Sequence, residues 1–286
     1  MTDRVAVIGA GQMGNGIAHV FAQGGFPVTM IDVSTAALEK GRATIASNLD
    51  RQIKKGTIDA ATKEQVLGRL VTNSSLDACR DATIVIEAAT ERVDLKYQIF
   101  ADLDRAAPPG AILATNTSSI SITEIAARTN RPGQVIGMHF MNPVPVMQLV
   151  EVIRGIATSD ATTTRTLELS RAVGKIPVEV NDSPGFVANR ILMPMINEAI
   201  YTVMEGVATV EAVDTVMKLG MNHPMGPLAL ADFIGLDTCL AILEVMHQGL
   251  GDPKYRPCPL LRKYVAAGWL GKKSGRGFHD YAPARG

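Results

Sequence analysis

The chain has 286 residues, of which 47% are hydrophobic, and its 28 basic residues equal its 28 acidic residues. This length and apolar content allow one large domain or two ordinary domains with sizeable cores. A net charge of zero provides no long-range field for nucleic acid or for an anionic membrane, so an anionic ligand must be held by local groups. No apolar run approaches membrane-spanning length and no basic-then-apolar leader precedes the first strand, so we expect a cytoplasmic protein without a membrane partner.

The three cysteines, Cys79, Cys239 and Cys258, are few and odd in number. Their spacing is typical of neither a metal site nor a redox site. We therefore expect structural thiols in a reducing compartment and no bound metal.

The chain opens with a buried strand, a glycine-rich turn and a helix. Gly9, Gly11 and Gly14 allow a tight turn, close approach of the backbone to a pyrophosphate, and close packing of the helix, whose N-terminal amides face the anion. A second predicted strand, 27–31, ends in Asp32, which would accept hydrogen bonds from ribose hydroxyls and repel a 2′-phosphate. An ordinary glycine-rich turn is the alternative, but the strand before, the helix after and the acidic residue favour binding of NAD over NADP.

Strands and helices then alternate through the first two thirds of the chain, which predicts a mostly parallel sheet covered on both faces. Ser34 is expected to cap the first long helix of this region. The predicted helices are 35–55, 60–69, 93–106, 122–128 and 162–173. The predicted strands are 70–72, 83–87, 111–115, 134–140, 147–153 and 176–180.

The strand signal disappears after the turn 181–185, where Ser183 is the predicted helix cap and Pro184 the first helical residue. The sequence therefore predicts an α/β, Rossmann-type, doubly wound domain over residues 1–183, followed by an all-α domain over residues 184–286. The predicted helices of the second domain are 186–204, 210–219, 228–248 and 259–267. A helical domain this apolar can cover one face with a second copy of itself, so we expect a homodimer.

One histidine and one carboxylate lie among apolar residues between the strands 134–140 and 147–153. If the two strands pair across the turn 142–145, Glu151 comes beside His139. A carboxylate hydrogen-bonded to one imidazole nitrogen fixes the tautomer and stabilises the imidazolium, so that the other nitrogen can take a proton from a substrate. The pattern indicates a general base with its orienting partner, and a satisfied core pair is the alternative.

Two further polar positions are candidates for substrate contacts. Thr117, Ser118 and Ser119 follow an apolar strand and lie at its carboxyl end, where open α/β sheets bind ligands. The alternative is that they only cap the next helix. Asn189, near the start of the first helix of the second domain, can present an amide to a cleft between the domains, and a helix-surface or capping asparagine is the alternative.

Seven segments in this order form a highly specific set. They are Gly9–Gly14, Ile86–Glu91, Thr115–Ser119, Gly137–Val144, Ser183–Arg190, His223–Pro227 and Gly275–Phe278. Over essentially its whole length the chain resembles the bacterial 3-hydroxyacyl-CoA dehydrogenases specific for short-chain substrates. Ala188 and His279 depart from residues that are often bulkier or aromatic in the family, and neither replaces a polar group of the mechanism.

The resemblance implies reversible hydride transfer between NAD and a short-chain 3-hydroxyacyl-CoA thioester. It implies that His139 is the base and Glu151 its partner, and that Ser118 and Asn189 contact the hydroxyl and thioester ends of the substrate. The cofactor contacts implied by the family are Gly9, Gly11, Gln12, Met13, Gly14, Asp32, Glu91, Lys96, Ser118, Asn142 and Lys273. Without Glu91 and a cofactor to hold it, Lys96 is an exposed helix lysine.

Coenzyme A needs cations for its phosphates, and Arg51, Lys54 and Lys55 lie at the end of the long helix after Asp32. The resemblance favours this region, with Lys55 as the chosen contact and Asn48 as its neighbour. A solvated helix end whose cations complement the helix dipole is the alternative.

Two other classes of function remain open at this point. One is a dinucleotide-binding protein without catalysis, similar to the crystallin relatives of the family, and the intact set of His139, Glu151, Ser118 and Asn189 argues against it. The other is a dehydrogenase of free hydroxy acids with a lysine base in the first helix of the second domain, where Asn189 and Arg190 stand instead.

Overall fold

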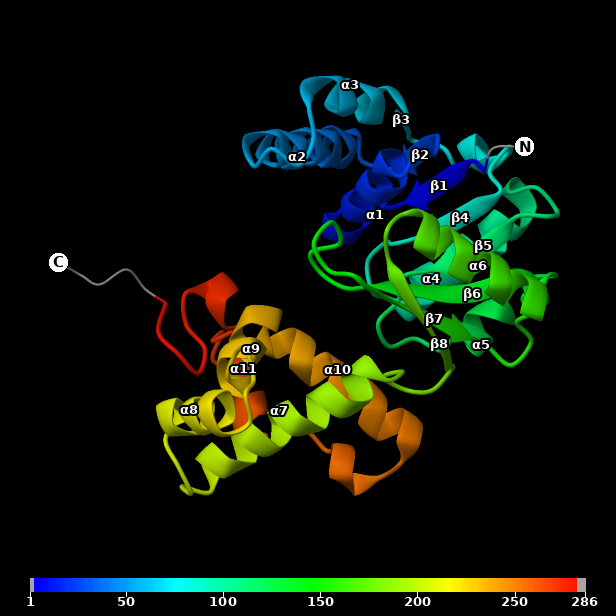
Figure 1. Ribbon diagram of the computed structural model, residues 1–286. Coiled ribbons are helices and arrows are strands. Elements are labelled where there is room, and N and C mark those ends of the chain that lie inside the picture. Colours follow the sequence, from blue (N-terminus) through cyan, green and yellow to red (C-terminus); the bar gives the residue numbers. More distant parts are fainter. Residues whose placement is uncertain (1–2, 282–286) are drawn as a thin grey trace. The chain divides into compact units, whose positions relative to one another are not determined.

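The computed structural model describes residues 3–281 (Figure 1). The chain divides into two compact units between Asp182 and Ser183. The first unit alternates strands with helices, and the second is built from helices. Among residues 3–281, no helix combines the length and apolar character needed to cross a bilayer.

The first unit is organised around one eight-stranded sheet with the order β3-β2-β1-β4-β5-β6-β7-β8. All neighbouring strands are parallel except β6 and β7, which are antiparallel. The strands are β1 (Val5–Ile8), β2 (Val28–Ile31), β3 (Leu70–Asn73), β4 (Ile84–Glu87), β5 (Ile112–Thr115), β6 (Val135–Phe140), β7 (Leu149–Arg154) and β8 (Ile176–Asn181). The helices are α1 (Gln12–Gln23), α2 (Thr35–Lys54), α3 (Ala60–Gly68), α4 (Val93–Ala106), α5 (Ile122–Ala126) and α6 (Asp160–Ala172).

The central strands are apolar on both faces because helices cover both sides of the sheet. β1, β4 and β5 are buried at every position, whereas the edge strands β3 and β8 expose most of theirs. A continuous apolar run is what a buried parallel strand requires. The predicted α/β class with a doubly wound, mostly parallel sheet is confirmed.

Helix α1 packs its apolar face on this sheet, with Ile17 and Phe21 fully buried. The ring of Phe21 meets that of Phe140 edge to face, with ring centroids 6.4 Å apart. Ser34 caps α2 as predicted, since its hydroxyl oxygen accepts the backbone N–H of Ala37 at 3.2 Å. The core therefore connects α1 directly to the strand that ends beside His139.

The second unit contains five α-helices among the described residues. They are α7 (Ala188–Met204), α8 (Val210–Gly220), α9 (Pro227–Ile234), α10 (Leu236–Leu250) and α11 (Pro259–Ala266). Its core includes Met193, Ile196, Leu228, Leu243 and Met246, all at most 1% exposed. The predicted helical second domain is confirmed.

Two predicted helix boundaries in this unit are wrong. Helix α7 begins at Ala188 and not at Pro184, because Gly185 and Phe186 both have positive φ, +79° and +47°, which is incompatible with a right-handed helix. Ser183 accepts the N–H of Phe186 in a turn and is not a helix cap. The predicted helix 228–248 is two helices, since Gly235 has φ +104° and separates α9 from α10.

Candidate active site

The turn after β1 has the conformation that a dinucleotide loop requires. Gly9 has φ +100°, and a Cβ on Gly14 would lie 1.9 Å from the carbonyl oxygen of Gly9, so neither position accepts a larger side chain. A Cβ on Gly11 meets nothing within 4 Å, which leaves open space over the N-terminus of α1. These residues fit a pyrophosphate held by backbone amides at a helix N-terminus.

Asp32 lies at the end of β2, beside this loop. Its carboxylate accepts the backbone N–H of Ala10 at 2.8 Å and that of Ser34 at 2.9 Å. The next side chain, Val33, is 94% exposed and carries no charge. The loop and the carboxylate are therefore held together, and the position after Asp32 offers no cation for a 2′-phosphate.

His139 and Glu151 face one another across the antiparallel pair β6 and β7, in direct register. The Nδ1 of His139 lies 2.8 Å from Oε2 of Glu151, and the two residues are 9% and 2% exposed. The expected pairing of the two strands is confirmed. Side chains that lie directly opposite one another on adjacent strands are necessarily close, so the pairing of β6 with β7 brings His139 and Glu151 into contact.

Lys175 closes the turn between these strands, a role that no sequence pattern had indicated. Its ammonium donates to the carbonyl oxygens of Val144 and Met147, at 2.5 and 2.7 Å, and the residue is 8% exposed. Burial lowers the pKa of Lys175. The cation thus satisfies carbonyl groups that a turn beside the base-bearing strand cannot satisfy within a ladder.

The residues after β5 form a turn that is tied to the same strand. The side-chain oxygen of Asn116 accepts the N–H of Phe140 at 2.9 Å, directly after His139. The hydroxyl of Thr117 accepts the N–H groups of Ser119 and Ile120 within the turn. Helix α5 is capped by Ser121, whose hydroxyl accepts the N–H of Glu124, so the alternative that residues 117–119 cap it is wrong.

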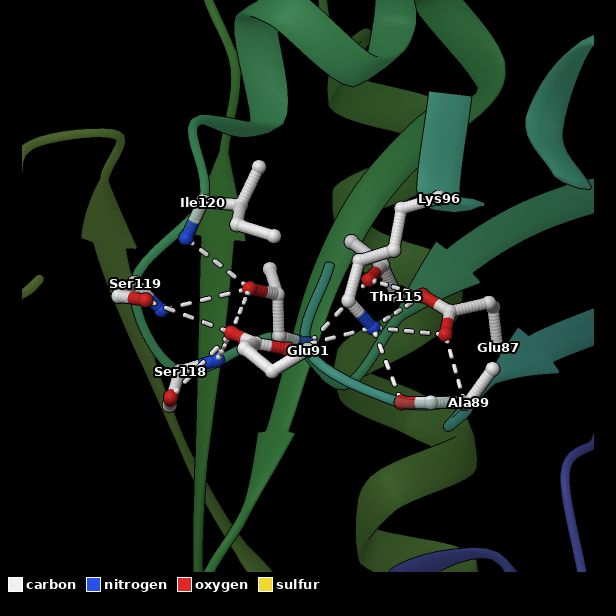
Figure 2. A network of polar contacts seen from close by, with 9 residues as sticks. Glu87, Ala89, Glu91, Lys96, Thr115, Ser118, Ser119 and Ile120 are labelled. Atoms are coloured by element: carbon white, nitrogen blue, oxygen red, sulfur yellow. Dashed lines mark hydrogen bonds and ion pairs between the residues drawn. The ribbon is translucent and has the colours of Figure 1, made fainter. Parts of the chain in front are cut away.

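The carboxylate of Glu91 accepts several hydrogen bonds from this turn, as Figure 2 shows. Its Oε1 accepts the N–H of Ser118 at 2.9 Å, and the hydroxyls of Thr117 and Ser118 also donate to it. Its Oε2 lies 3.3 Å from the ammonium of Lys96. Burial by itself would raise the pKa of Glu91, but Lys96, Thr117 and the Ser118 N–H together lower it. The carboxylate therefore stays ionised under the turn that carries Ser118.

Lys96 is not the exposed helix lysine that the sequence left open, since it is 1% exposed. Its ammonium lies 2.7 and 2.9 Å from the two carboxylate oxygens of Glu87, a residue that is 0% exposed (Figure 2). Sequence reasoning missed Glu87, although an acidic residue that ends the apolar strand Ile84–Glu87 was a signal for a buried partner.

A pocket of about 530 Å³ is lined by Gly11 of the glycine loop and brings three more predicted ligand residues to it. Gln12, Asn48 and Asn142 line it, and Lys40 and Thr44 of α2 add a cation and a hydroxyl. The side-chain amide of Gln12 donates to that of Asn142 at 3.1 Å. The predicted contact Lys55 follows the last turn of α2 and is not among the residues that line this pocket.

The predicted contact Met13 lies in the first turn of α1, and the other two candidates, Asn189 and Lys273, belong to the second unit. Asn189 lies in the first turn of α7 and is 8% exposed. Lys273 pairs with the carboxylate of Asp237, with the closer oxygen 2.6 Å from its ammonium, and both side chains are about half exposed. Helix α7 contains no lysine, so the lysine base of a free hydroxy-acid dehydrogenase has no counterpart in that helix.

The thiols and the acidic groups of the described chain do not form a metal centre. Within residues 3–281 no group of three or more His, Cys, Asp or Glu side chains has the geometry to hold a metal ion. Cys79, Cys239 and Cys258 are buried free thiols, and burial raises the pKa of Cys79 and of Cys239 to about 12. Such thiols are packed and unreactive.

Comparison with known proteins assigns the chain to a family. The model of the NAD binding domain of 3-hydroxyacyl-CoA dehydrogenase matches residues 4–183, and the model of the C-terminal domain matches residues 185–281. A Bacillus subtilis protein named "Probable 3-hydroxybutyryl-CoA dehydrogenase" is 62% identical over 97% of this chain and 97% of its own. The 3-hydroxybutyryl-CoA dehydrogenase of Bradyrhizobium diazoefficiens is 57% identical over 99% of this chain and 96% of its own.

Among solved structures, (S)-3-hydroxybutyryl-CoA dehydrogenase from Ralstonia eutropha is 54% identical and superposes with a TM-score of 0.96. The match covers 99% of this chain and 100% of that one. The chain therefore belongs to the 3-hydroxyacyl-CoA dehydrogenase family of NAD-dependent oxidoreductases.

Proposed function

We propose that the protein is a 3-hydroxybutyryl-CoA dehydrogenase that interconverts short-chain 3-hydroxyacyl-CoA and 3-oxoacyl-CoA with NAD as cofactor. The observation that carries this proposal is the buried contact of His139 with Glu151, at 2.8 Å, on the strand next to the one that leads into Ser118. The names of relatives that are 57% and 62% identical over nearly the whole chain support the substrate class.

His139 acts as the general base in the oxidation. It takes the proton of the 3-hydroxyl group, and in the reverse direction its imidazolium returns that proton to the 3-oxo oxygen. Glu151 accepts a hydrogen bond from Nδ1, which keeps Nε2 as the proton-accepting nitrogen and stabilises the imidazolium. The nicotinamide of the bound cofactor supplies the hydride acceptor, and the hydride donor in the reverse direction.

Ser118 and Asn189 bind the substrate in this proposal. The hydroxyl of Ser118 donates to the reacting oxygen in place of its 3.3 Å contact with Glu91, and the amide of Asn189 holds the thioester end. The N–H of Ser118 donates to the carboxylate of Glu91, which holds Ser118 in place, and Asn116 connects its turn to the strand of the base. Orientation of this kind is what converts a bound alcohol into a reactive one.

The cofactor contacts that we propose combine the glycine loop with side chains around it. They are Gly9, Gly11, Gln12, Met13, Gly14, Asp32, Glu91, Lys96, Ser118, Asn142 and Lys273. Asp32 selects NAD over NADP, because its carboxylate repels a 2′-phosphate and Val33 offers no compensating charge. Lys96 is buried against two carboxylates, so it acts on the cofactor through Glu91.

Coenzyme A is held near α2 in this proposal. Asn48, with Lys40 and Thr44, lines the pocket beside the glycine loop and can bind the polar groups of the CoA moiety. Lys55, about two turns beyond Asn48, supplies a cation for a phosphate. The pocket offers both a cation and apolar side chains, as a phosphorylated thioester carrier requires.

We also propose that the protein is a cytoplasmic homodimer, joined through the helical unit. A groove of about 740 Å³ runs along α7 and is lined by the apolar residues Ile191, Pro194 and Met195. Charged residues of both signs also line it: Arg190, Lys254 and Arg256, and Glu198 and Glu205. Because a twofold interface is self-complementary, a patch with both signs suits a second copy. Light scattering after size exclusion tests the dimer, and Ile191→Asp, on a side chain 68% exposed, is expected to give monomers.

NADH oxidation followed by absorbance tests the function. We expect rapid loss of NADH with acetoacetyl-CoA, slow reaction with NADPH, and none with free acetoacetate. Reduction of free acetoacetate would instead indicate a dehydrogenase of free hydroxy acids. Binding of NADH without turnover of either substrate would indicate a non-catalytic dinucleotide-binding protein.

A further inference from the structure

Glu87 is a buried carboxylate that the proposed reaction does not use. It ends β4 and is 0% exposed, yet every part of its carboxylate is engaged. Oε1 accepts the N–H of Ala89 at 2.7 Å, Oε2 accepts the hydroxyl of Thr115 at 2.7 Å, and both oxygens contact the ammonium of Lys96 (Figure 2). A buried charge with this many partners is rigid, because leaving any of them unpaired is costly.

The ammonium of Lys96 connects this rigid carboxylate to a more exposed one. It also lies 3.3 Å from Oε2 of Glu91, whose side chain is 39% exposed. Without a cation beside it, a carboxylate at that exposure gains side-chain freedom and hydration by turning toward water. Lys96 is itself immobilised by Glu87, so Glu91 is anchored to the end of a core strand.

Glu91 in turn holds the turn that carries Ser118. Its Oε1 is the common acceptor for the N–H of Ser118 and for the hydroxyls of Thr117, Ser118 and Ser119. The segments β4, α4 and the turn after β5 are thus joined by one chain of charge-assisted hydrogen bonds, which are stronger than neutral ones.

We propose that Glu87 is a positioning residue for the reaction: through Lys96 it holds the Glu91 carboxylate, and through Glu91 it holds Ser118 in its working position. For the role of Ser118 the inference rests on the proposed function. Glu87 touches neither substrate nor cofactor in this proposal, so its removal acts only through the residues that it orients.

Double-mutant cycles distinguish positioning from general support of the fold. We expect Glu87→Gln to lower kcat with acetoacetyl-CoA about tenfold, the loss that one charge-assisted hydrogen bond represents. In the Ser118→Ala background the same change should lower kcat less than about twofold, because its target is already absent. An equal loss in both backgrounds, or no loss in the unaltered background, overturns the proposal.

A second cycle uses NADH affinity, measured by calorimetry, and requires no turnover. Glu87→Gln should weaken NADH about tenfold alone and less than about twofold in the Glu91→Gln background. If the unaltered protein does not reduce acetoacetyl-CoA, the proposed function fails, and this cycle still decides whether Glu87 acts through Glu91. Equal weakening in both backgrounds contradicts that action.

Two further variants control for folding. Glu124→Gln makes the same chemical change on α5, at a carboxylate that contacts Tyr97 of α4, and it should leave kcat and NADH affinity within about twofold. If Glu87→Gln does not fold, the variant Glu87→Gln with Lys96→Met removes both buried charges together, which is far less disruptive than removing one. That double variant should melt like the unaltered protein and still lose kcat, and full kcat would overturn the proposal.

Discussion

Two buried histidines in the first unit differ in one neighbour. His139 on β6 is 9% exposed and lies 2.8 Å from the carboxylate of Glu151. His19 on α1 is 0% exposed, and no carboxylate among the described residues forms an ion pair with it. Its Nε2 lies 3.3 Å from the side-chain amide of Gln52.

The difference distinguishes a packing histidine from the histidine that we propose as the acid–base group. Burial lowers the pKa of His19 to about 4, a hydrogen bond with Gln23 opposes the shift in part, and the charge of Lys175 adds to it. His19 is therefore a neutral packing residue at physiological pH. In the proposed reaction His139 accepts and returns a proton, and the carboxylate of Glu151, 2.8 Å from its Nδ1, orients the ring.

The largest expected effect is on turnover. His139→Gln should lower kcat by about two to four orders of magnitude, the usual contribution of a general acid–base group, and should leave NADH affinity nearly unchanged. The matched variant His19→Gln should keep kcat within about twofold, because that ring takes no part in proton transfer. Steady-state kinetics and NADH titration test both, and loss of NADH binding in His139→Gln would contradict the assignment.

The next effect concerns stability at acid pH. Between about pH 6.5 and pH 4 the unfolded chain protonates His19 and the folded chain does not, so stability is lost as the pH falls through this window. The loss should reach about 3 kcal/mol at pH 4, from a shift of about 2.5 units.

Urea unfolding at pH 7 and at pH 4 measures this loss. The always neutral variant His19→Asn should lose about 3 kcal/mol less than the unaltered protein between the two pH values. An equal loss in both proteins would mean that the folded protein protonates His19 over the same pH range as the unfolded chain.

A smaller effect is expected from the partner of the base. Glu151→Gln keeps a hydrogen-bond acceptor beside Nδ1 but removes the charge that stabilises the imidazolium. It should lower kcat about tenfold to a hundredfold, the range of a hydrogen bond to a charged group, with unchanged NADH affinity. A kcat equal to that of the unaltered protein would reduce Glu151 to a packing role.

The smallest effect is expected when a carboxylate is introduced beside His19. Gln52→Glu places a carboxylate beside His19 and should raise the pKa of that histidine by roughly one to three units. Titration of the His19 ring by NMR, in the unaltered protein and in the variant, measures the shift. A pKa that stays near 4 would show that burial outweighs an adjacent charge at this site.

Much of the fold follows from local patterns. The apolar strands, the glycine loop and the cap Ser34 were all predicted correctly, because each depends on the periodicity or the backbone needs of a short segment. The predictions failed at two positions in the second unit where the backbone has a positive φ that only packing explains. Phe186, with φ +47°, delays the start of α7, and Gly235 divides a run that reads as one continuous helix.

The candidate site divides in the same way. The contact between His139 and Glu151 could be predicted, because the two strands follow one another in the chain and pair antiparallel, and their register sets the neighbours. The burial of Lys96 could not be predicted. Its partners Glu87 and Glu91 come from a strand end and a loop, and helical spacing alone suggests a solvated lysine.

The sequence by itself determined the class of fold, the dinucleotide loop and the His139–Glu151 pair, because these depend on residues close in the chain or on adjacent paired strands. Only the tertiary structure decided that Glu87, Lys96 and Glu91 form one network under Ser118 and that Lys175 closes the turn after His139. It also decided that His19 forms no ion pair with a carboxylate of residues 3–281. The physical reason is that a buried charge takes its properties from side chains brought together by packing, and their identity is not encoded in local spacing.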